Sequence, residues 1–280
     1  MEIEKAQGLG LCFGVRRAVK LLKDAANKYG EIETLGPIAH NQQLVEELSK
    51  VGVKPVNHLD QVQGKILAIT THGVSPAVLS EAKARQIHVI DTTCPIVCKA
   101  QNIAKELAES DFNVIIFGEP EHSEVKGLLG WTGSKGIVAL DVRQINFPKK
   151  LPYRLGLISQ TTQNKSAFIE FARQLELTFG SKAKELRIVN TLCQAVQKRQ
   201  EAALSLAKRS QLMIVMGGYN SANSKRLAEA CSPLVETYLI ERAEEVVDSW
   251  LEGKHLIGIA AGTSTPDETI EELVAKLKRL

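Results

Sequence analysis

The chain lacks any long apolar run. Among its 280 residues, no stretch approaches the roughly 18 consecutive apolar residues of a transmembrane helix, so we expect no membrane span and no membrane partner. The first five residues, Met-Glu-Ile-Glu-Lys, contain no apolar segment of the kind that signal peptides carry. Five cysteines, an odd number, in a long chain without an export signal indicate free thiols in the reducing cytoplasm.

Several functional signatures are missing as well. Lysine and arginine are scattered and the formal net charge is only +3, which argues against nucleic acid and is compatible with a small anionic substrate. Neither a Walker A sequence nor G-x-G-x-x-G after an apolar run is present, so we expect no bound nucleotide. No two cysteines have the C-x₂-C spacing that structural zinc sites usually show.

What is present is an alternation of short apolar runs with amphipathic helical patterns, which indicates an α/β fold with mostly parallel sheets. The first helix is predicted over residues 15–29, with Gly30 as its stop. For the last helix we expect Thr265 as the N-cap, Pro266 in the first turn and Glu268 closing a capping box. Its predicted buried stripe is Ile270, Leu273, Val274 and Leu277.

The apolar runs form three similar thirds. Each third has strands that end in polar residues, and each contributes one of Cys12, Cys94 and Cys193. We therefore predict three small α/β modules with a pseudo-threefold relation around one central site, because ligands bind beyond the carboxyl ends of parallel strands. The predicted bounds are 13–94 for the first module, 95–190 for the second and 191–280 for the third, which the N-terminal strand 1–12 completes.

The three cysteines lie far apart in sequence but share one local setting, an apolar run before the thiol and a helical pattern after it. Soft thiolates select zinc, Cu(I) or an iron–sulfur cluster. Three thiolates on a four-iron cluster leave one iron open to substrate, whereas electron-transfer clusters usually take four. The ordinary alternative for any cysteine is a small buried side chain, and we assign that role to Cys98 and Cys231.

A closed zinc site is the alternative to a cluster. Cys12, Cys94, Cys193 and one histidine would complete a tetrahedral set. The protein would then be a phosphometabolite-binding or regulatory module without redox activity. The absence of close cysteine pairs argues against this alternative.

A second group of residues at the strand ends consists of hydrogen-bond donors. They are His40, His72, His122, Ser221, Asn223 and Ser264. Most stand at the start of a helical pattern, where unpaired N–H groups and the positive end of the helix dipole favour phosphate. A second interpretation stays open, because serine and asparagine are ordinary helix caps and a loop histidine is often only a surface residue.

Glu124 stands apart from these donors. It comes two residues after His122, at the mouth of an apolar strand, where a carboxylate can handle protons for a reaction. The alternative is a solvated acid in the first turn of a helix. Thr161, after another strand, either hydrogen-bonds a ligand hydroxyl or caps a helix.

Taken together, these segments carry a resemblance over essentially the full length of the chain. The motifs are Cys12-Phe13-Gly14-Val15, Gly36-Pro37-Ile38-Ala39-His40-Asn41, Thr71-His72-Gly73-Val74-Ser75, Asp91-Thr92-Thr93-Cys94-Pro95, His122-Ser123-Glu124-Val125, Gln160-Thr161-Thr162, Cys193, Arg199-Gln200, Asn220-Ser221-Ala222-Asn223-Ser224 and Ala261-Gly262-Thr263-Ser264-Thr265-Pro266-Asp267. In order and spacing the chain resembles the 4-hydroxy-3-methylbut-2-enyl diphosphate reductase (IspH/LytB) family.

The resemblance implies a reductive dehydroxylation, the last step of the methylerythritol phosphate route to isoprenoids, which gives isopentenyl and dimethylallyl diphosphate. It implies one oxygen-sensitive [4Fe–4S] cluster per chain on Cys12, Cys94 and Cys193. It places the substrate diphosphate among His40, His72, His122, Ser221, Ala222, Asn223 and Ser264. It makes Glu124 the proton donor and Thr161 a partner of the substrate hydroxyl. The implied electron donor is external, such as ferredoxin or flavodoxin with its reductase.

The chain departs from the family pattern at four positions. Ser123 replaces the usual proline between His122 and Glu124, and Ala222 replaces the second of two serines, which removes one hydroxyl from the expected diphosphate site. Val196 stands where threonine is common, and Cys98 is an additional thiol. No expected cluster ligand is lost, so the resemblance still implies activity, with an altered affinity for diphosphate.

Overall fold

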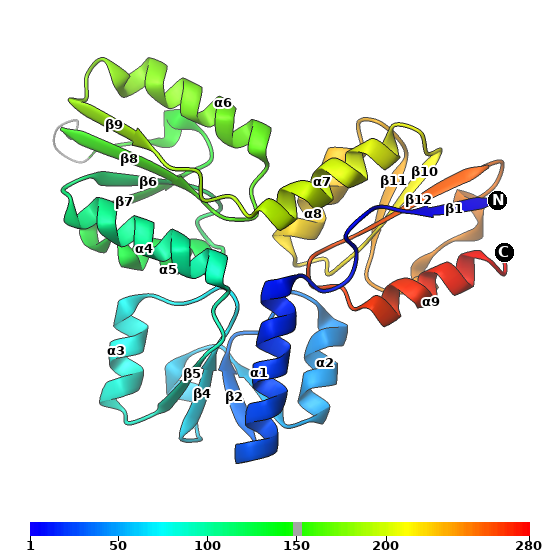
Figure 1. Ribbon diagram of the computed structural model, residues 1–280, viewed down its shortest axis with the longest axis horizontal. Coiled ribbons are helices and arrows are strands. Elements are labelled where there is room, and N and C mark those ends of the chain that lie inside the picture. Colours follow the sequence, from blue (N-terminus) through cyan, green and yellow to red (C-terminus); the bar gives the residue numbers. More distant parts are fainter. Residues whose placement is uncertain (148–152) are drawn as a thin grey trace. The chain divides into compact units, whose positions relative to one another are not determined.

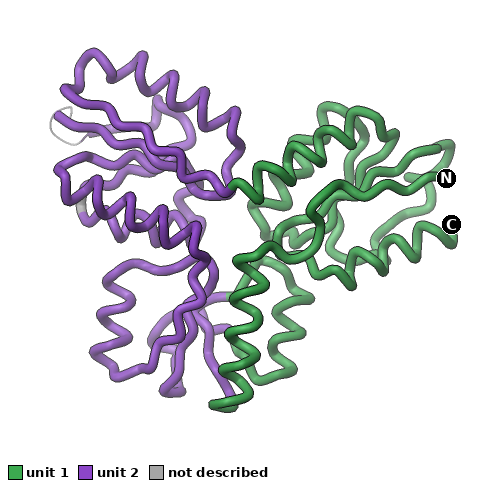
Figure 2. The backbone as a smooth tube through the Cα atoms, in the orientation of Figure 1, with its two compact units in different colours: residues 1–30, 37–54, 194–280 green, residues 31–36, 55–193 purple. Residues whose placement is uncertain are grey.

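The computed structural model describes residues 1–147 and 153–280. Within them the chain forms two compact units, each of which draws on separate segments of sequence (Figure 2). Unit 1 comprises Met1–Gly30, Pro37–Lys54 and Gln194–Leu280, and unit 2 comprises Glu31–Gly36 and Pro55–Cys193. The units are described separately below. The three module boundaries expected from sequence stay a prediction.

Three four-stranded sheets share one topology. Their strand orders are β3-β2-β4-β5, β7-β6-β8-β9 and β11-β10-β12-β1, and the described strand pairs are parallel. The strands are β1 (Glu2–Lys5), β2 (Ile32–Leu35), β3 (Val53–Val56), β4 (Ile66–Ile69), β5 (His88–Asp91), β6 (Asn113–Phe117), β7 (Gly136–Ala139), β8 (Arg154–Ser159), β9 (Glu185–Ile188), β10 (Leu212–Met216), β11 (Thr237–Ile240) and β12 (Leu256–Ala261). The α/β class with parallel sheets and a repeated module is thereby confirmed. The N-terminal strand β1 pairs with β12, close to the other end of the sequence.

Nine α-helices accompany these sheets in the described part of the chain (Figure 1). They are α1 (Phe13–Tyr29), α2 (Gln42–Lys50), α3 (Pro76–Ala84), α4 (Pro95–Glu109), α5 (Ser123–Trp131), α6 (Lys165–Leu175), α7 (Gln194–Ala207), α8 (Ala222–Cys231) and α9 (Asp267–Leu277). Shorter helical turns are η1 (Leu59–Gln61), η2 (Gly133–Lys135), η3 (Val142–Gln144), η4 (Glu176–Gly180), η5 (Ala243–Glu245) and η6 (Asp248–Trp250). Within residues 1–147 and 153–280 no helix has both the length and the apolar character to cross a membrane.

In unit 1 the sheet β11-β10-β12-β1 is covered on both faces. Alternate residues of a strand point to opposite faces, so Ile214 and Met216 pack against α9 while Met213 and Val215 pack against α7 and α8. Both faces are apolar, as expected for a parallel sheet between helix layers. This arrangement holds the carboxyl ends of β10 and β12 in fixed positions.

In unit 2 the sheet β7-β6-β8-β9 follows the same plan (Figure 1). Val114 and Ile116 of β6 pack against α4 and α5, and Ile115 and Phe117 pack against α6. The sheet β3-β2-β4-β5 buries Leu67 and Ile69 against Ala82 of α3. The carboxyl ends of β4, β6 and β8 are therefore rigid supports for the loops that follow them.

The predicted first and last helices are present, with one correction. Helix α1 ends before Gly30, whose φ of 82° suits glycine, and the predicted stripe of α9 is buried. The predicted cap of α9 is wrong. Thr265 Oγ1 donates to Met216 O at 3.1 Å, and the helix begins after Pro266, which stands at the N-cap position. The hydroxyl satisfies a carbonyl at the end of β10 instead of an amide of its own helix.

Candidate functional site

The three cysteines occupy equivalent positions in the repeated topology. Each follows an edge strand, β1, β5 or β9, and directly precedes a helix, α1, α4 or α7. In each case the cysteine amide donates to a threonine carbonyl beyond the neighbouring strand: Cys12 N to Thr263 O (2.9 Å), Cys94 N to Thr71 O (3.0 Å) and Cys193 N to Thr161 O (2.8 Å). The local setting inferred from sequence is therefore present, with the same backbone hydrogen bond in each of the three.

The chemistry of these thiols suits a soft metal centre. All five cysteines are free, and Cys12, Cys94 and Cys193 are partly exposed at helix N-termini, where the dipole favours anionic groups. Burial raises the pKa of the Cys231 thiol to about 11, so this cysteine stays protonated and is unsuited as a ligand. Cys98 lies one turn into α4, with its Sγ 4.0 Å from Thr93 O. The three partly exposed thiols thus fit an iron–sulfur cluster.

Glu124 is held by Thr161 in unit 2. The carboxylate is only 2% exposed, and its two oxygens accept from Thr161 N (2.6 Å) and Thr161 Oγ1 (2.9 Å). Glu124 is therefore not a solvated acid at a helix start, although it does lie in the first turn of α5. Thr161 is not a helix cap, since the cap of α6 is Asn164.

His122 links this carboxylate to a second histidine. His122 Nδ1 accepts from Glu124 N at 3.2 Å and caps α5, so Nε2 is the ring nitrogen positioned to donate. The His72 ring lies edge-on to the His122 ring, with centroids 5.5 Å apart. Thr161 O accepts from Cys193 N, and Thr71 O accepts from Cys94 N. Both cysteines of unit 2 are therefore hydrogen-bonded to the segments that carry the partner of Glu124 and His72.

In unit 1 the predicted donors lie beyond β10 and β12. The two strand ends are joined by Gly262 N, which donates to Met216 O at 2.8 Å. Ser221 caps α8 by accepting from Ser224 N, so its cap interpretation is correct, and Ala222 and Asn223 form the start of that helix. Ser264, in the loop after β12, is buried.

His40 reaches the same region of unit 1. A Cβ on Gly218 would lie 2.0 Å from the carbonyl oxygen of His40, so only glycine lets the loop after β10 approach so closely. Burial lowers the pKa of the His40 imidazole below its usual range. The ring is therefore neutral at pH 7 until an anion stabilises its charged form.

Sequence reasoning assigned no role to Arg199, although it belongs to one of the motifs. Its guanidinium donates to Gly262 O (3.0 Å) and to Gly10 O (2.7 Å). These bonds connect α7 to the loop that precedes Ser264 and to the loop that precedes Cys12. The available signal was the Arg199-Gln200 pair among the family motifs. Arg199 is a positioning residue for the Cys12 loop.

A protein-family comparison matches residues 3–278 to the family described as LytB protein. The chain belongs to the LytB family. Relatives named 4-hydroxy-3-methylbut-2-enyl diphosphate reductase include one from Dehalococcoides mccartyi, 43% identical over 100% of this chain and 99% of its own. Another, from Geobacter sulfurreducens, is 39% identical over 99% and 97%. The family inferred from sequence motifs is thereby confirmed.

Solved LytB-family structures agree with the fold. The structure of (E)-4-hydroxy-3-methyl-but-2-enyl diphosphate reductase, the terminal enzyme of the non-mevalonate pathway, is 36% identical, covers 100% of both chains and has a TM-score of 0.73. A reductase structure from Plasmodium falciparum has a TM-score of 0.92 at 24% identity, over 99% of this chain and 88% of that one. Because the Plasmodium falciparum structure is only 24% identical, it supports the fold assignment alone.

Proposed function

We propose that this LytB-family protein reduces 4-hydroxy-3-methylbut-2-enyl diphosphate to isopentenyl and dimethylallyl diphosphate. The allylic C–O bond breaks, a C–H bond forms, and two electrons and two protons are consumed with release of water. The observation that carries the proposal is the repeated cysteine setting, a thiol after each edge strand with the same amide-to-threonine bond. Relatives at 39% and 43% identity over nearly the whole chain, all named as this reductase, support it.

Cys12, Cys94 and Cys193 would hold one [4Fe–4S] cluster per chain. Such a cluster supplies single electrons and, at an iron without a protein ligand, a Lewis acid for the substrate hydroxyl. The zinc alternative is not favoured, because the relatives are named as reductases. The five free thiols suit the reducing cytoplasm, where we place the enzyme.

Glu124 is the proposed proton donor. Both carboxylate oxygens are oriented by Thr161, so the acid is fixed before substrate arrives and needs no reorganisation during the reaction. Its burial keeps bulk water away from the proton it delivers. Thr161, whose hydroxyl is hydrogen-bonded to Glu124, would also contact the substrate hydroxyl.

The diphosphate would be bound by His40, His72, His122, Ser221, Asn223 and Ser264. His122 offers its Nε2–H as a donor, because Nδ1 already accepts from Glu124 N. Ser221 and Asn223 lie at the N-terminus of α8, a ten-residue helix whose positive dipole end attracts phosphate oxygens. These contacts anchor the substrate at a distance from the bond that breaks.

Diphosphate binding should take up protons through His40. The free imidazole is neutral because burial lowers its pKa, and a bound anion raises that pKa again. The affinity should therefore fall as pH rises through neutrality, by at most roughly tenfold per pH unit for one proton. Calorimetric titration in buffers of different ionisation enthalpy measures the uptake. It should shrink in His40→Asn and persist in His255→Asn, an exposed control. Equal uptake in both variants would contradict the assignment.

Replacing Ala222 by serine should have a small effect on substrate affinity. It is the first residue of α8, buried beside the capping serine, and Ala222→Ser adds one donor for a charged acceptor, worth about 1.5–3 kcal/mol at best. In water the same phosphate oxygen would be hydrogen-bonded to solvent, which the hydroxyl would have to displace, so the net gain should stay within about tenfold. KM should fall while kcat stays nearly constant, because the diphosphate does not react. A changed kcat at constant KM would remove residue 222 from the diphosphate site.

Turnover by anaerobically prepared protein tests the proposed function. With reduced methyl viologen as electron source, 4-hydroxy-3-methylbut-2-enyl diphosphate should be converted to both products, identified by mass spectrometry. Protein stripped of iron by a chelator serves as the control and should give none. Iron-loaded protein that binds the substrate without converting it would reject the proposal.

A further inference from the structure

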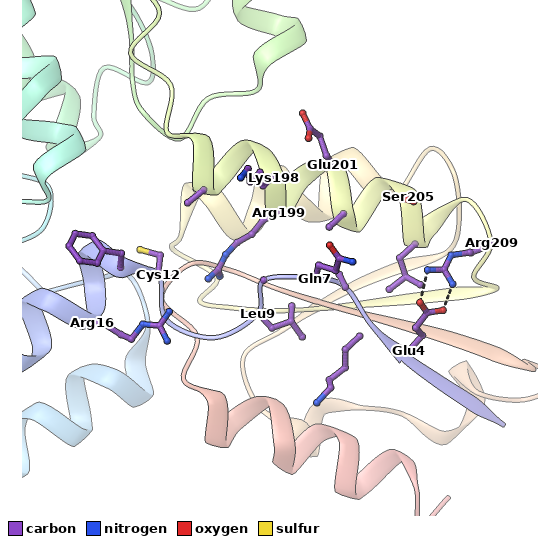
Figure 3. A pocket seen from close by; sticks show the side chains of 17 residues that line it. Glu4, Gln7, Leu9, Cys12, Arg16, Lys198, Arg199, Glu201, Ser205 and Arg209 are labelled. Carbon is purple, nitrogen blue, oxygen red and sulfur yellow. Dashed lines mark hydrogen bonds and ion pairs between the residues drawn. The ribbon is translucent and has the colours of Figure 1, made fainter.

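A pocket of about 780 Å³ in unit 1 lies outside the proposed substrate contacts. Its walls are the chain from β1 to the start of α1 and the outer face of α7 (Figure 3). Cys12 and Arg16 lie at one end, and the ion pair between Glu4 and Arg209 lies at the other. The pocket is therefore a surface hollow with a proposed cluster ligand at its end.

The end near Cys12 carries an exposed aromatic side chain. Phe13, the first residue of α1, is 70% exposed although it directly follows the thiol. Ala195, on the opposite wall, stands two residues after Cys193 in the chain. An apolar ring beside a redox ligand, surrounded by polar groups, is typical of a contact surface for another protein.

The pocket lining carries more cations than anions. Five lysines and arginines line it against two glutamates; of the five, Lys5 and Arg209 pair with Glu271 and Glu4, and Arg199 donates to backbone carbonyls. Arg16 and Lys198 are exposed, and neither has an ion-pair partner among the residues that the structure describes. Both are therefore available to attract a negatively charged partner.

We propose that this pocket is the docking surface for a small acidic one-electron carrier protein that reduces the cluster beside Cys12. The inference rests on the proposed function, which consumes two electrons per substrate. Two carrier molecules would each be oxidised by one electron for every product formed. Arg16 and Lys198 steer the carrier electrostatically, and Phe13 fills the contact between it and the thiol.

A protein carrier fits better than a nicotinamide nucleotide. Nicotinamide delivers a hydride, a pair of electrons with a proton, whereas an iron–sulfur cluster accepts electrons singly. The sequence also lacks a dinucleotide-binding motif. Redox partners form small, weak interfaces that rely on charge complementarity for fast encounter, which suits the two exposed cations Arg16 and Lys198.

Charge reversal tests the proposal on the cluster-loaded protein. The double variant Arg16→Glu/Lys198→Glu should lower the rate constant for reduction by an acidic [2Fe–2S] ferredoxin about tenfold at low ionic strength, within the range that steering supplies. High salt should narrow the difference. The Kd for oxidised ferredoxin, measured by calorimetry without turnover, should rise by a similar factor. Lys278→Glu/Arg279→Glu, a double reversal of the same charge at exposed residues after α9, is the matched control and should leave both unchanged.

Methyl viologen separates docking from catalysis. Reduced viologen is a cation, so the double variant should retain viologen-driven turnover. Unchanged ferredoxin kinetics and binding would overturn the docking site, as would an equal loss with both donors, or direct reduction of the wild type by NADPH. Absence of viologen-driven turnover in the wild type would instead reject the proposed function.

Discussion

Replacing Cys94 by serine is expected to abolish both the cluster and the activity. In the proposed site the Cys94 thiolate is a metal ligand, and a serine hydroxyl at the same position would remain protonated and be a much harder donor. Losing even an outer partner of a metal site typically costs roughly 10–100-fold, so the loss of a direct ligand should exceed about 100-fold in turnover. Iron content, visible absorption and turnover after anaerobic purification measure the effect. Cys12→Ser and Cys193→Ser should behave alike, since the three thiols share one local structure.

The two remaining cysteines supply matched controls. Cys98→Ser should keep the cluster, because Cys98 lies within α4 rather than before it. For Cys231 the better control is Cys231→Ala, since its side chain is buried in the apolar core beneath α7 and α8, where a hydroxyl would be costly. An active cluster in Cys94→Ser, or its loss in Cys98→Ser, would show that the ligand set is misassigned.

Glu124→Gln should lower kcat by roughly 10²–10⁴-fold, the range that general acid–base groups supply. Glutamine keeps the shape and both contacts to Thr161, because its carbonyl accepts from the amide and its NH₂ donates to the hydroxyl oxygen. It cannot deliver a proton. The cluster spectrum and the Kd for substrate should therefore stay close to wild type while turnover falls.

Glu121→Gln is the control for this variant. Glu121 lies just before α5, is exposed and pairs only with Lys126 at the surface, an interaction worth little. Its kcat should be unchanged. A near-normal kcat for Glu124→Gln would move the proton donor elsewhere, to His122 or to the substrate diphosphate itself.

Sequence patterns were sufficient for the repeated architecture and for the places where strands end. Parallel strands with both faces covered appear as short apolar runs, and the polar residues after them mark the carboxyl edge of the sheet. Cys12, Cys94 and Cys193 are found instead by the helical pattern after each thiol, because the strands before them, β1, β5 and β9, are partly exposed edge strands. The sequence predicts that the N-terminal strand completes the third module, whereas its pairing with β12 is known only from the structure.

Contacts between loops were beyond the reach of sequence patterns. The bond between Glu124 and Thr161 joins residues 37 positions apart, and nothing in either segment specifies its partner. The same holds for Arg199, which contacts Gly10 across 189 positions of sequence. For Thr265 the local capping pattern predicts the wrong partner. Its hydroxyl donates to Met216 O, a distant backbone group, instead of capping α9. Each case is decided by which unsatisfied backbone group the fold brings nearby.

Metal and sulfide analysis of protein purified without oxygen distinguishes a cluster from zinc at the three cysteines. Three thiols in one repeated setting are proposed to hold a single [4Fe–4S] cluster, so we expect about four irons and four sulfides per chain, with no zinc. One zinc per chain without iron or sulfide would contradict it, and would make the three cysteines a structural site instead of a redox centre.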